Sequence, residues 1–241
     1  MSGSTWRCVG CGALFADYFA TCSSCWRVKS LVPLGHRLRA RADYEPGVSN
    51  ARALASLAWR KVEHAGAYDP LMLGASALVL VSGAPGSGKS SMSCRLANAV
   101  KGPVLYIAAE EGISPSLAAR LLRCGVKRAD FHVLTRASVD TAVAFATKHK
   151  CVAAVVDSVQ EAVWQAHELR HVLEVVTSLD VLVAVAQVTK EGAAAGSNAY
   201  QHECDVHVRV ESMAWSLAKS RYQDLAGIGG TVLPSKETEA A

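Results

Sequence analysis

The chain has 241 residues, of which 51% are apolar and 19% are charged, and its formal net charge is +4. This composition excludes a wholly disordered chain, which would have fewer apolar residues and more net charge. No apolar run reaches the roughly 18 residues of a membrane span, and the first residues lack the apolar stretch of a signal peptide. We therefore predict a cytoplasmic protein without a membrane partner, comprising one full domain and a small additional module.

Positive charge is concentrated near the N-terminus. Residues 1–61 contain 9 Lys and Arg against 3 Asp and Glu, a balance of +6, whereas residues 62–241 contain 16 against 18, a balance of −2. Arg37, Arg39 and Arg41 alternate within the basic part. Two interpretations are open for this stretch: a solvated linker, or a contact with a polyanion.

Four of the eight cysteines form two C-x2-C pairs separated by ten residues: Cys8, Cys11, Cys22 and Cys25. Two such pairs supply the four thiolates of a structural zinc site, whereas disulfides need an oxidising compartment. We predict a zinc ribbon over 1–30, where the closed metal site stabilises a module too small for its own core. The other four are expected to pack as small apolar side chains: Cys94, Cys124, Cys151 and Cys204.

A phosphate-binding motif follows the first apolar strand, predicted over 77–81. The motif is G-x4-G-K-S, and a helix predicted over 91–100 comes after it. Backbone N–H groups of such a loop converge on phosphate oxygens, Lys89 is placed to reach the β- and γ-phosphates, and Ser90 to ligate Mg²⁺. The predicted nucleotide-binding residues are Gly83, Ala84, Pro85, Gly86, Ser87, Gly88, Lys89, Ser90 and Ser91.

Strands and helices then alternate along the chain. We predict strands over 104–108, 131–134, 152–156 and 181–186, and helices over 116–124, 139–148 and 161–179. Apolar strands separated by amphipathic helices indicate a mainly parallel sheet covered on both faces. Ligands of such sheets bind at the carboxyl ends of the strands. This edge is predicted to bring together the loop 83–90, Glu110, Asp157 and Gln187.

Phosphoryl-transfer chemistry suggests a role for each of these side chains. Asp157 orients Mg²⁺, and Glu110, or Glu111 beside it, polarises the attacking water. Gln187 senses the γ-phosphate and moves the loop that follows it. The structural alternative is that a strand-ending carboxylate such as Asp157 merely caps the next helix.

The segment 188–200 is rich in Gly, Ala and Ser, which is typical of either a mobile partner-binding loop or a flexible connector. Two antiparallel strands are predicted after it, over 206–210 and 215–218. Lys219 and Arg221 follow them. These two cations are interpreted either as an arginine-finger-like insertion into a neighbouring subunit's site or as plain surface charges.

Taken in order, the motifs resemble the RadA (Sms) branch of the RecA-like recombination ATPases. The similar segments are the zinc spacing, G-A-P-G-S-G-K-S, V-L-Y-I-A-A-E-E, V-V-D-S-V-Q, V-T-K-E-G and K-S-R-Y. The resemblance implies a RecA-like P-loop ATPase core over 73–233, joined to the zinc ribbon by a basic linker and helical lead-in over 31–72. A polar tail over 234–241 ends the chain, and we expect a short form without the family's Lon-like domain.

The resemblance also implies a function. Family members are hexameric ATPases that bind single-stranded DNA and drive branch migration. We therefore expect DNA-stimulated hydrolysis of Mg-ATP in a hexamer or filament for DNA repair or recombination, with Lys219 or Arg221 acting across a subunit boundary. Ser197 and Asn198 replace the Pro and Arg of the family's loop, and Gln223 replaces a Gly. Without the loop Arg, the stretch Arg37–Arg41 becomes a stronger candidate for the DNA contact. The alternative is a nucleotide-gated loader that recruits a recombinase or replicative helicase with little motor activity.

Overall fold

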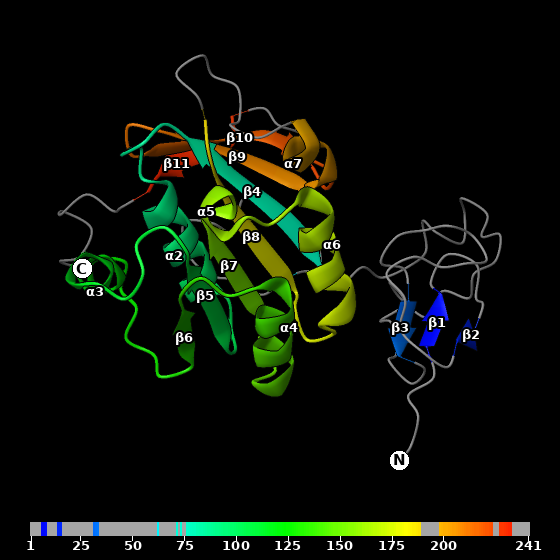
Figure 1. Ribbon diagram of the computed structural model, residues 1–241. Coiled ribbons are helices and arrows are strands. Elements are labelled where there is room, and N and C mark those ends of the chain that lie inside the picture. Colours follow the sequence, from blue (N-terminus) through cyan, green and yellow to red (C-terminus); the bar gives the residue numbers. More distant parts are fainter. Residues whose placement is uncertain are drawn as a thin grey trace. The chain divides into compact units, whose positions relative to one another are not determined.

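The computed structural model describes residues 62, 71, 73, 76–188, 198–223 and 227–232, together with the backbone of three short strands nearer the N-terminus (Figure 1). The chain divides into two units, Met1–Pro46 and Gly47–Ala241. No helix in the described ranges is long and apolar enough to cross a membrane.

The first unit contains a three-stranded antiparallel sheet. Its order is β2-β1-β3, formed by β1 (Trp6–Cys8), β2 (Leu14–Phe15) and β3 (Leu31–Pro33). Cys8, the first predicted zinc ligand, is the last residue of β1 and pairs with Leu31. The other three predicted ligands lie outside the described residues, so the zinc ribbon stays a prediction.

The second unit is built on an eight-stranded sheet of order β11-β10-β9-β4-β8-β7-β5-β6 (Figure 1). Six strands from β9 to β6 in this order are parallel, and β10 and β11 are antiparallel to their neighbours. The strands are β4 (Ala77–Gly83), β5 (Val104–Ala108), β6 (Phe131–Leu134), β7 (Ala153–Asp157), β8 (Val181–Gln187), β9 (Val206–Glu211), β10 (Ala214–Ser220) and β11 (Gly229–Thr231).

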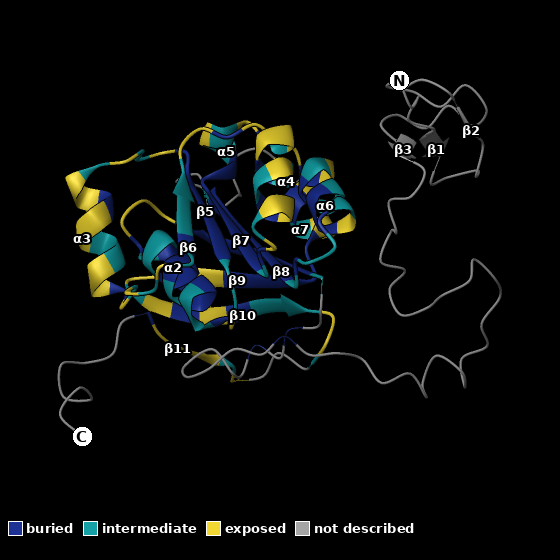
Figure 2. Ribbon diagram, turned by 90° about the horizontal axis from the view of Figure 1, so that it is seen from below, coloured by how far each residue is buried: buried dark blue, intermediate teal, exposed yellow. Residues whose placement is uncertain are grey.

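Helices cover both faces of this sheet. They are α2 (Lys89–Ala99), α3 (Pro115–Arg123), α4 (Val139–Lys148), α5 (Val159–Ala162), α6 (Ala166–Val175) and α7 (Asn198–Glu203). Side chains alternate along each strand, so one core includes residues of α2 and α3 and the other includes residues of α4 to α7. β4, β5 and β7 are buried throughout and β8 is buried as far as Ala186, while the outer faces of α3 and α4 are exposed (Figure 2). The expected α/β fold with a mainly parallel sheet is confirmed.

Three elements differ from expectation. The helix predicted over 161–179 is two helices, because Val163 adopts a left-handed φ of 58° and ends α5. The break turns Trp164 into the core, where its indole N–H donates to the carbonyl of Ala137 at 3.1 Å. α7 begins inside the segment predicted as a loop over 188–200 and continues to Glu203, and Tyr200 of α7 donates to the Trp164 carbonyl at 2.5 Å. The short edge strand β11 was not predicted.

The buried carboxylate of Asp205 accepts hydrogen bonds from β4, from α6 and from the residue that follows β10. Asp205, just before β9, is 2% exposed and accepts the N–H of Leu78 at 2.9 Å. Its two oxygens accept from the Arg170 guanidinium at 2.9 and 2.8 Å, and Arg221 donates to it at 3.1 Å. Burial opposes the charged form, but the hydrogen bonds from Arg170 and Leu78 hold the pKa of Asp205 below its ordinary value.

A buried histidine lies beside the strand that leads to the phosphate loop. His207 of β9 is 4% exposed, and its Nε2 is hydrogen-bonded to the Ser82 hydroxyl of β4 at 2.7 Å. Burial, followed by the nearby charges of Arg209 and Lys219, lowers the pKa of His207 to about 4. The imidazole is therefore neutral in the folded protein at neutral pH.

This histidine gives the fold a predictable pH dependence. Between pH 6.5 and 4 the unfolded chain takes up a proton at this position and the folded chain does not, so acid favours unfolding. We expect the free energy of unfolding of the wild type, relative to His207→Gln, to fall by about 3 kcal/mol over this range. Urea unfolding at several pH values measures it. His167→Gln, at an exposed position, is the matched control. A difference in unfolding free energy between the wild type and His207→Gln that does not change with pH would contradict the prediction.

Candidate active site

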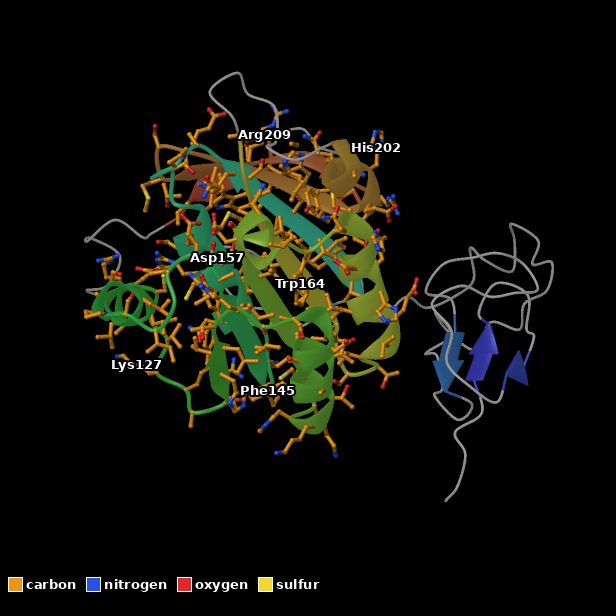
Figure 3. The ribbon with its side chains drawn as sticks, viewed as in Figure 1. Lys127, Phe145, Asp157, Trp164, His202 and Arg209 are labelled. Carbon is orange, nitrogen blue, oxygen red and sulfur yellow. The ribbon has the colours of Figure 1, made fainter. Side chains whose placement is uncertain are left out.

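The register of the parallel strands brings the predicted site residues to one edge of the sheet. Gly83, at the end of β4, pairs with Gln187, at the end of β8. Asp157, at the end of β7, pairs with Ala108 on β5 and Val185 on β8. The carboxyl ends of four adjacent strands therefore meet at this edge, where Figure 3 labels Asp157.

The phosphate loop joins β4 to α2. A side chain at Gly83 would place its Cβ 2.2 Å from the Val210 carbonyl oxygen, so no larger residue fits there. Gly88 has a left-handed φ of 104° and immediately precedes α2. The Lys89 ammonium lies across the loop and donates to the Ala84 carbonyl at 2.8 Å. Loop N–H groups and the start of α2 thus form the kind of anion site that phosphates occupy.

Two carboxylates, those of Glu110 and Asp157, partly balance the charge of Lys89. Burial lowers the pKa of the Lys89 ammonium, and the carboxylates of Glu110 and Asp157 oppose this shift. Lys89 is 7% exposed. The ammonium is thus already largely desolvated in the position where a phosphate would meet it, which strengthens its attraction for that anion.

The turn between β9 and β10 braces the phosphate loop. The Met213 N–H donates to the Ser87 carbonyl at 2.9 Å, and the Val232 N–H donates to the Met213 carbonyl at 2.8 Å. Ser212 and Met213 have φ of 47° and 65°, as a tight two-residue hairpin turn requires. The sequence E-S-M-A carries no Gly or Asn signal for such a turn, so we did not predict this contact.

Donors from three elements converge on Asp157. Asp157 is 4% exposed and accepts from the Ser90 hydroxyl at 3.2 Å and from the Tyr106 hydroxyl. Arg120 of α3 lies 3.4 Å from the same carboxylate and 2.5 Å from Glu111. Burial raises the pKa of Asp157, and the hydrogen bonds from Tyr106 and Ser90 and the charge of Arg120 oppose this shift. Sequence reasoning missed Tyr106 and Arg120, whose roles depend on packing between distant segments.

The adjacent hydroxyl and carboxylate of Ser90 and Asp157 fit a magnesium ion, which prefers hard oxygen ligands. Ser90 is the second residue of α2, and Asp157 ends β7, so the two oxygens meet only because the strands are in register. When bound, Mg²⁺ neutralises and orients phosphate oxygens. The roles of both residues stay predictions.

Glu110 and Gln187 contact each other beside the phosphate loop. The Gln187 amide donates to Glu110 at 3.2 Å. The N–H groups of Ala109 and Glu110 both donate to the Asp157 carbonyl, at 2.8 and 3.1 Å, which fixes the turn after β5 against the end of β7. Since Glu111 pairs with Arg120, Glu110 is the carboxylate in contact with Gln187.

Lys219 and Arg221 lie away from this edge of their own chain. β10 runs antiparallel to β9, so its last residues pair with the beginning of β9, at the opposite edge of the sheet. The Lys219 ammonium donates to three carbonyl oxygens, those of Gln201, His202 and Cys204. Arg221 donates to Asp205 and to the His202 carbonyl, and half of its side chain is exposed. The predicted flexible loop lies largely outside the described residues, at 189–197.

Comparison with known proteins places this site in a family. The family model described as an AAA domain matches residues 55–205. The chain is 27% identical to the DNA repair protein RadA of Pseudomonas aeruginosa over 226 residues, covering 82% of this chain and 49% of that protein. It is 26% identical to RadA of Haemophilus influenzae, covering 90% of this chain and 53% of that protein. The chain thus spans about half the length of these relatives.

A solved structure supports the fold independently. A KaiC-like protein from Pyrococcus horikoshii OT3 superposes with a TM-score of 0.57 at 13% identity, covering 74% of this chain and all of that one. The resemblance to RadA that the motifs indicated is confirmed by the relatives. The match to the AAA domain over more than half of the sequence shows that the chain belongs to that family.

Proposed function

We propose that the chain binds and hydrolyses Mg-ATP in a RecA-like homo-oligomer, a hexamer or filament, and acts on single-stranded DNA in recombination or repair. The observation that carries the proposal is the meeting of five side chains at one edge of the sheet: Lys89, Ser90, Glu110, Asp157 and Gln187. Membership of the AAA domain family and similarity to proteins named for DNA repair support it.

Each side chain has a defined task in this proposal. The phosphate loop and Lys89 bind the phosphates, while Ser90 and Asp157 hold the magnesium ion that neutralises their charge. Glu110 accepts a proton from the attacking water, for which its contact with Gln187 orients the carboxylate. Gln187 is the last residue of β8. When a γ-phosphate changes the contact of Gln187 with Glu110, the segment that follows β8 changes position with it.

Arg221 is the stronger candidate for a residue acting across a subunit boundary. Its side chain is half exposed, whereas the three N–H donors of Lys219 have three carbonyl acceptors in their own chain. To reach a neighbour's phosphates, Arg221 would give up its bonds to Asp205 and to the His202 carbonyl. Asp205 would keep the bidentate Arg170 and the Leu78 N–H as donors. Within the chain, the basic N-terminal part of +6 is the proposed main contact with DNA, because residues 62–241 have a balance of −2.

Lys89→Ala tests the nucleotide site and its dependence on DNA. Loss of the ammonium is expected to lower the rate of ATP hydrolysis about 100-fold or more, because it removes the cation aimed at the transferring phosphate. Wild-type hydrolysis is measured with and without single-stranded DNA, and the mass in solution with ATP. Lys148→Ala, on the exposed face of α4, is the matched control. Equal wild-type rates with and without DNA would contradict the proposed action on DNA.

The pair Glu110→Gln and Glu111→Gln tests the proposed base. Glu110→Gln is expected to bind ATP normally and to hydrolyse it about 100-fold more slowly, as loss of a general base does. Glu111→Gln leaves the contact of Glu110 with Gln187 in place and is expected to retain most of the activity. Equal rates for the two variants would overturn the assignment. ATP-dependent capture of a recombinase or helicase by Glu110→Gln, without DNA-stimulated hydrolysis in the wild type, would favour the loader function.

We further propose that the four N-terminal cysteines hold a structural zinc ion. The donor set of four thiols in two C-x2-C pairs suits Zn²⁺, and β1 ends at the first of them, Cys8. Protein purified without chelators is expected to contain about one zinc ion per chain by atomic emission. Cys22→Ser should lose it, while Cys151→Ser, at a buried position in the second unit, keeps it. A wild-type protein with no zinc and four titratable thiols in this unit would overturn the proposal.

A further inference from the structure

Two cysteines outside the proposed zinc site face each other between helices. Cys94 of α2 is completely buried, and Cys124, directly after α3, is 4% exposed. Both belong to the same core on one face of the sheet. Both were expected to pack as small apolar side chains, and they do pack in a core, but against each other.

The backbone of α2 fixes this contact. The Cys124 thiol donates to the Ser91 carbonyl at 3.5 Å, which places its sulfur against the turn of α2 that contains Ser91. Cys94 is three residues further along the same helix face, and helical side chains lean toward the N-terminus. The Cys94 thiol therefore covers the turn that Cys124 touches, and the two thiols lie within hydrogen-bonding reach.

The surroundings make the two thiols unequal. The hydrogen bond from Cys94, together with the charges of Arg95 and Arg120, lowers the pKa of Cys124 despite its burial. The same hydrogen bond and burial raise the pKa of Cys94, which keeps its proton. By contrast, burial raises the pKa of Cys151 to about 11. When Cys124 releases the proton that it donates to the Ser91 carbonyl, a thiolate lies beside a protonated thiol. In this arrangement one cysteine attacks an oxidant and the other completes a disulfide.

We propose that Cys94 and Cys124 form a redox site that reacts with hydroperoxides and closes to a disulfide between α2 and the end of α3. The Cys124 thiolate attacks one peroxide oxygen and the O–O bond breaks, which leaves a sulfenic acid. The departing hydroxide takes up the proton that Cys124 released on becoming a thiolate and leaves as water. The Cys94 sulfur then attacks the Cys124 sulfur, the S–O bond breaks, and the Cys94 proton leaves with the hydroxide as water. Two thiols and one hydrogen peroxide thus yield one disulfide and two water molecules.

The site joins two elements of the nucleotide-binding edge. α2 begins at Lys89 of the phosphate loop, and α3 carries Arg120, which lies 3.4 Å from Asp157. A disulfide would join the middle of α2 to the residue that follows α3. The proposal does not depend on ATP hydrolysis or DNA binding, because it rests on the packing of α2 against α3 alone.

Peptide mapping of the oxidised wild-type protein tests the proposal. The folded chain is treated with hydrogen peroxide, free thiols are then blocked, and the protein is digested with trypsin without reduction. Cleavage after Lys89, Arg95, Arg123 and Lys127 releases the peptides 90–95 and 124–127. We expect them joined as one species, two hydrogens lighter than their sum, which a reductant separates.

Variants identify the order of the steps. Cys94→Ala is expected to form no link and to accumulate a sulfenic acid at Cys124 that dimedone traps, while Cys124→Ala gives no adduct at position 94. Cys151→Ala, which removes another buried thiol, should form the link as the wild type does. Free thiols at both positions after treatment, or oxidation of Cys124 to sulfinic acid without a linked peptide in the wild type, would overturn the proposal.

Discussion

A carboxylate enclosed within the protein is the constraint around which the site is arranged. Asp157 is 4% exposed, and an uncompensated buried charge costs several kcal/mol, so donors must reach it from its surroundings. They come from α2, β5 and α3, as Ser90, Tyr106 and Arg120. One side chain therefore fixes the phosphate-loop helix, a central strand and an outer helix relative to one another. The Asp157 backbone adds the turn that carries Glu110.

Two buried aspartates of the second unit differ in the direction in which their surroundings shift the carboxyl pKa. Asp205 is as buried as Asp157, but the bidentate Arg170 and the Leu78 N–H bring the pKa of its carboxyl below the ordinary value, whereas burial dominates at Asp157 and raises it. Asp205 is thus a satisfied structural anion. At Asp157 the hydrogen bonds and the charge of Arg120 do not fully offset burial, so a bound cation would stabilise its carboxylate.

Continuous apolar runs made the parallel strands predictable, because strands covered on both faces are apolar at every position. β5 and β6 coincide with their predicted ranges. The placement of Glu110, Asp157 and Gln187 at one edge followed from the parallel direction of the strands, whose carboxyl ends meet there. The break at Val163 was missed because it depends on Trp164 finding the Ala137 carbonyl, a contact between distant segments.

Some features of the site left no local signal in the sequence. Tyr106 reads as one more strand residue, and its hydroxyl becomes important only because β5 and β7 are neighbours. Likewise, nothing in K-S-R-Y shows that Lys219 donates to carbonyls in and just after α7 while Arg221 stays half exposed. These are properties of strand pairing and side-chain packing, which a single sequence specifies only through the complete fold.

β10 connects two parts of the second unit: the turn that contacts the phosphate loop and Arg221. The turn before it holds the phosphate loop through the bond between Met213 and Ser87, and Arg221 follows its other end. A strand of seven residues is about 23 Å long, so β10 runs from the edge of the sheet with the phosphate loop toward the opposite edge. β10 is hydrogen-bonded on both sides over Ala214–Ser216, next to the turn that contacts the phosphate loop, and its register with β9 shifts between Leu217 and Lys219. In the proposed oligomer, β10 is the short segment of chain that joins the contact with the phosphate loop to the guanidinium that faces the next subunit.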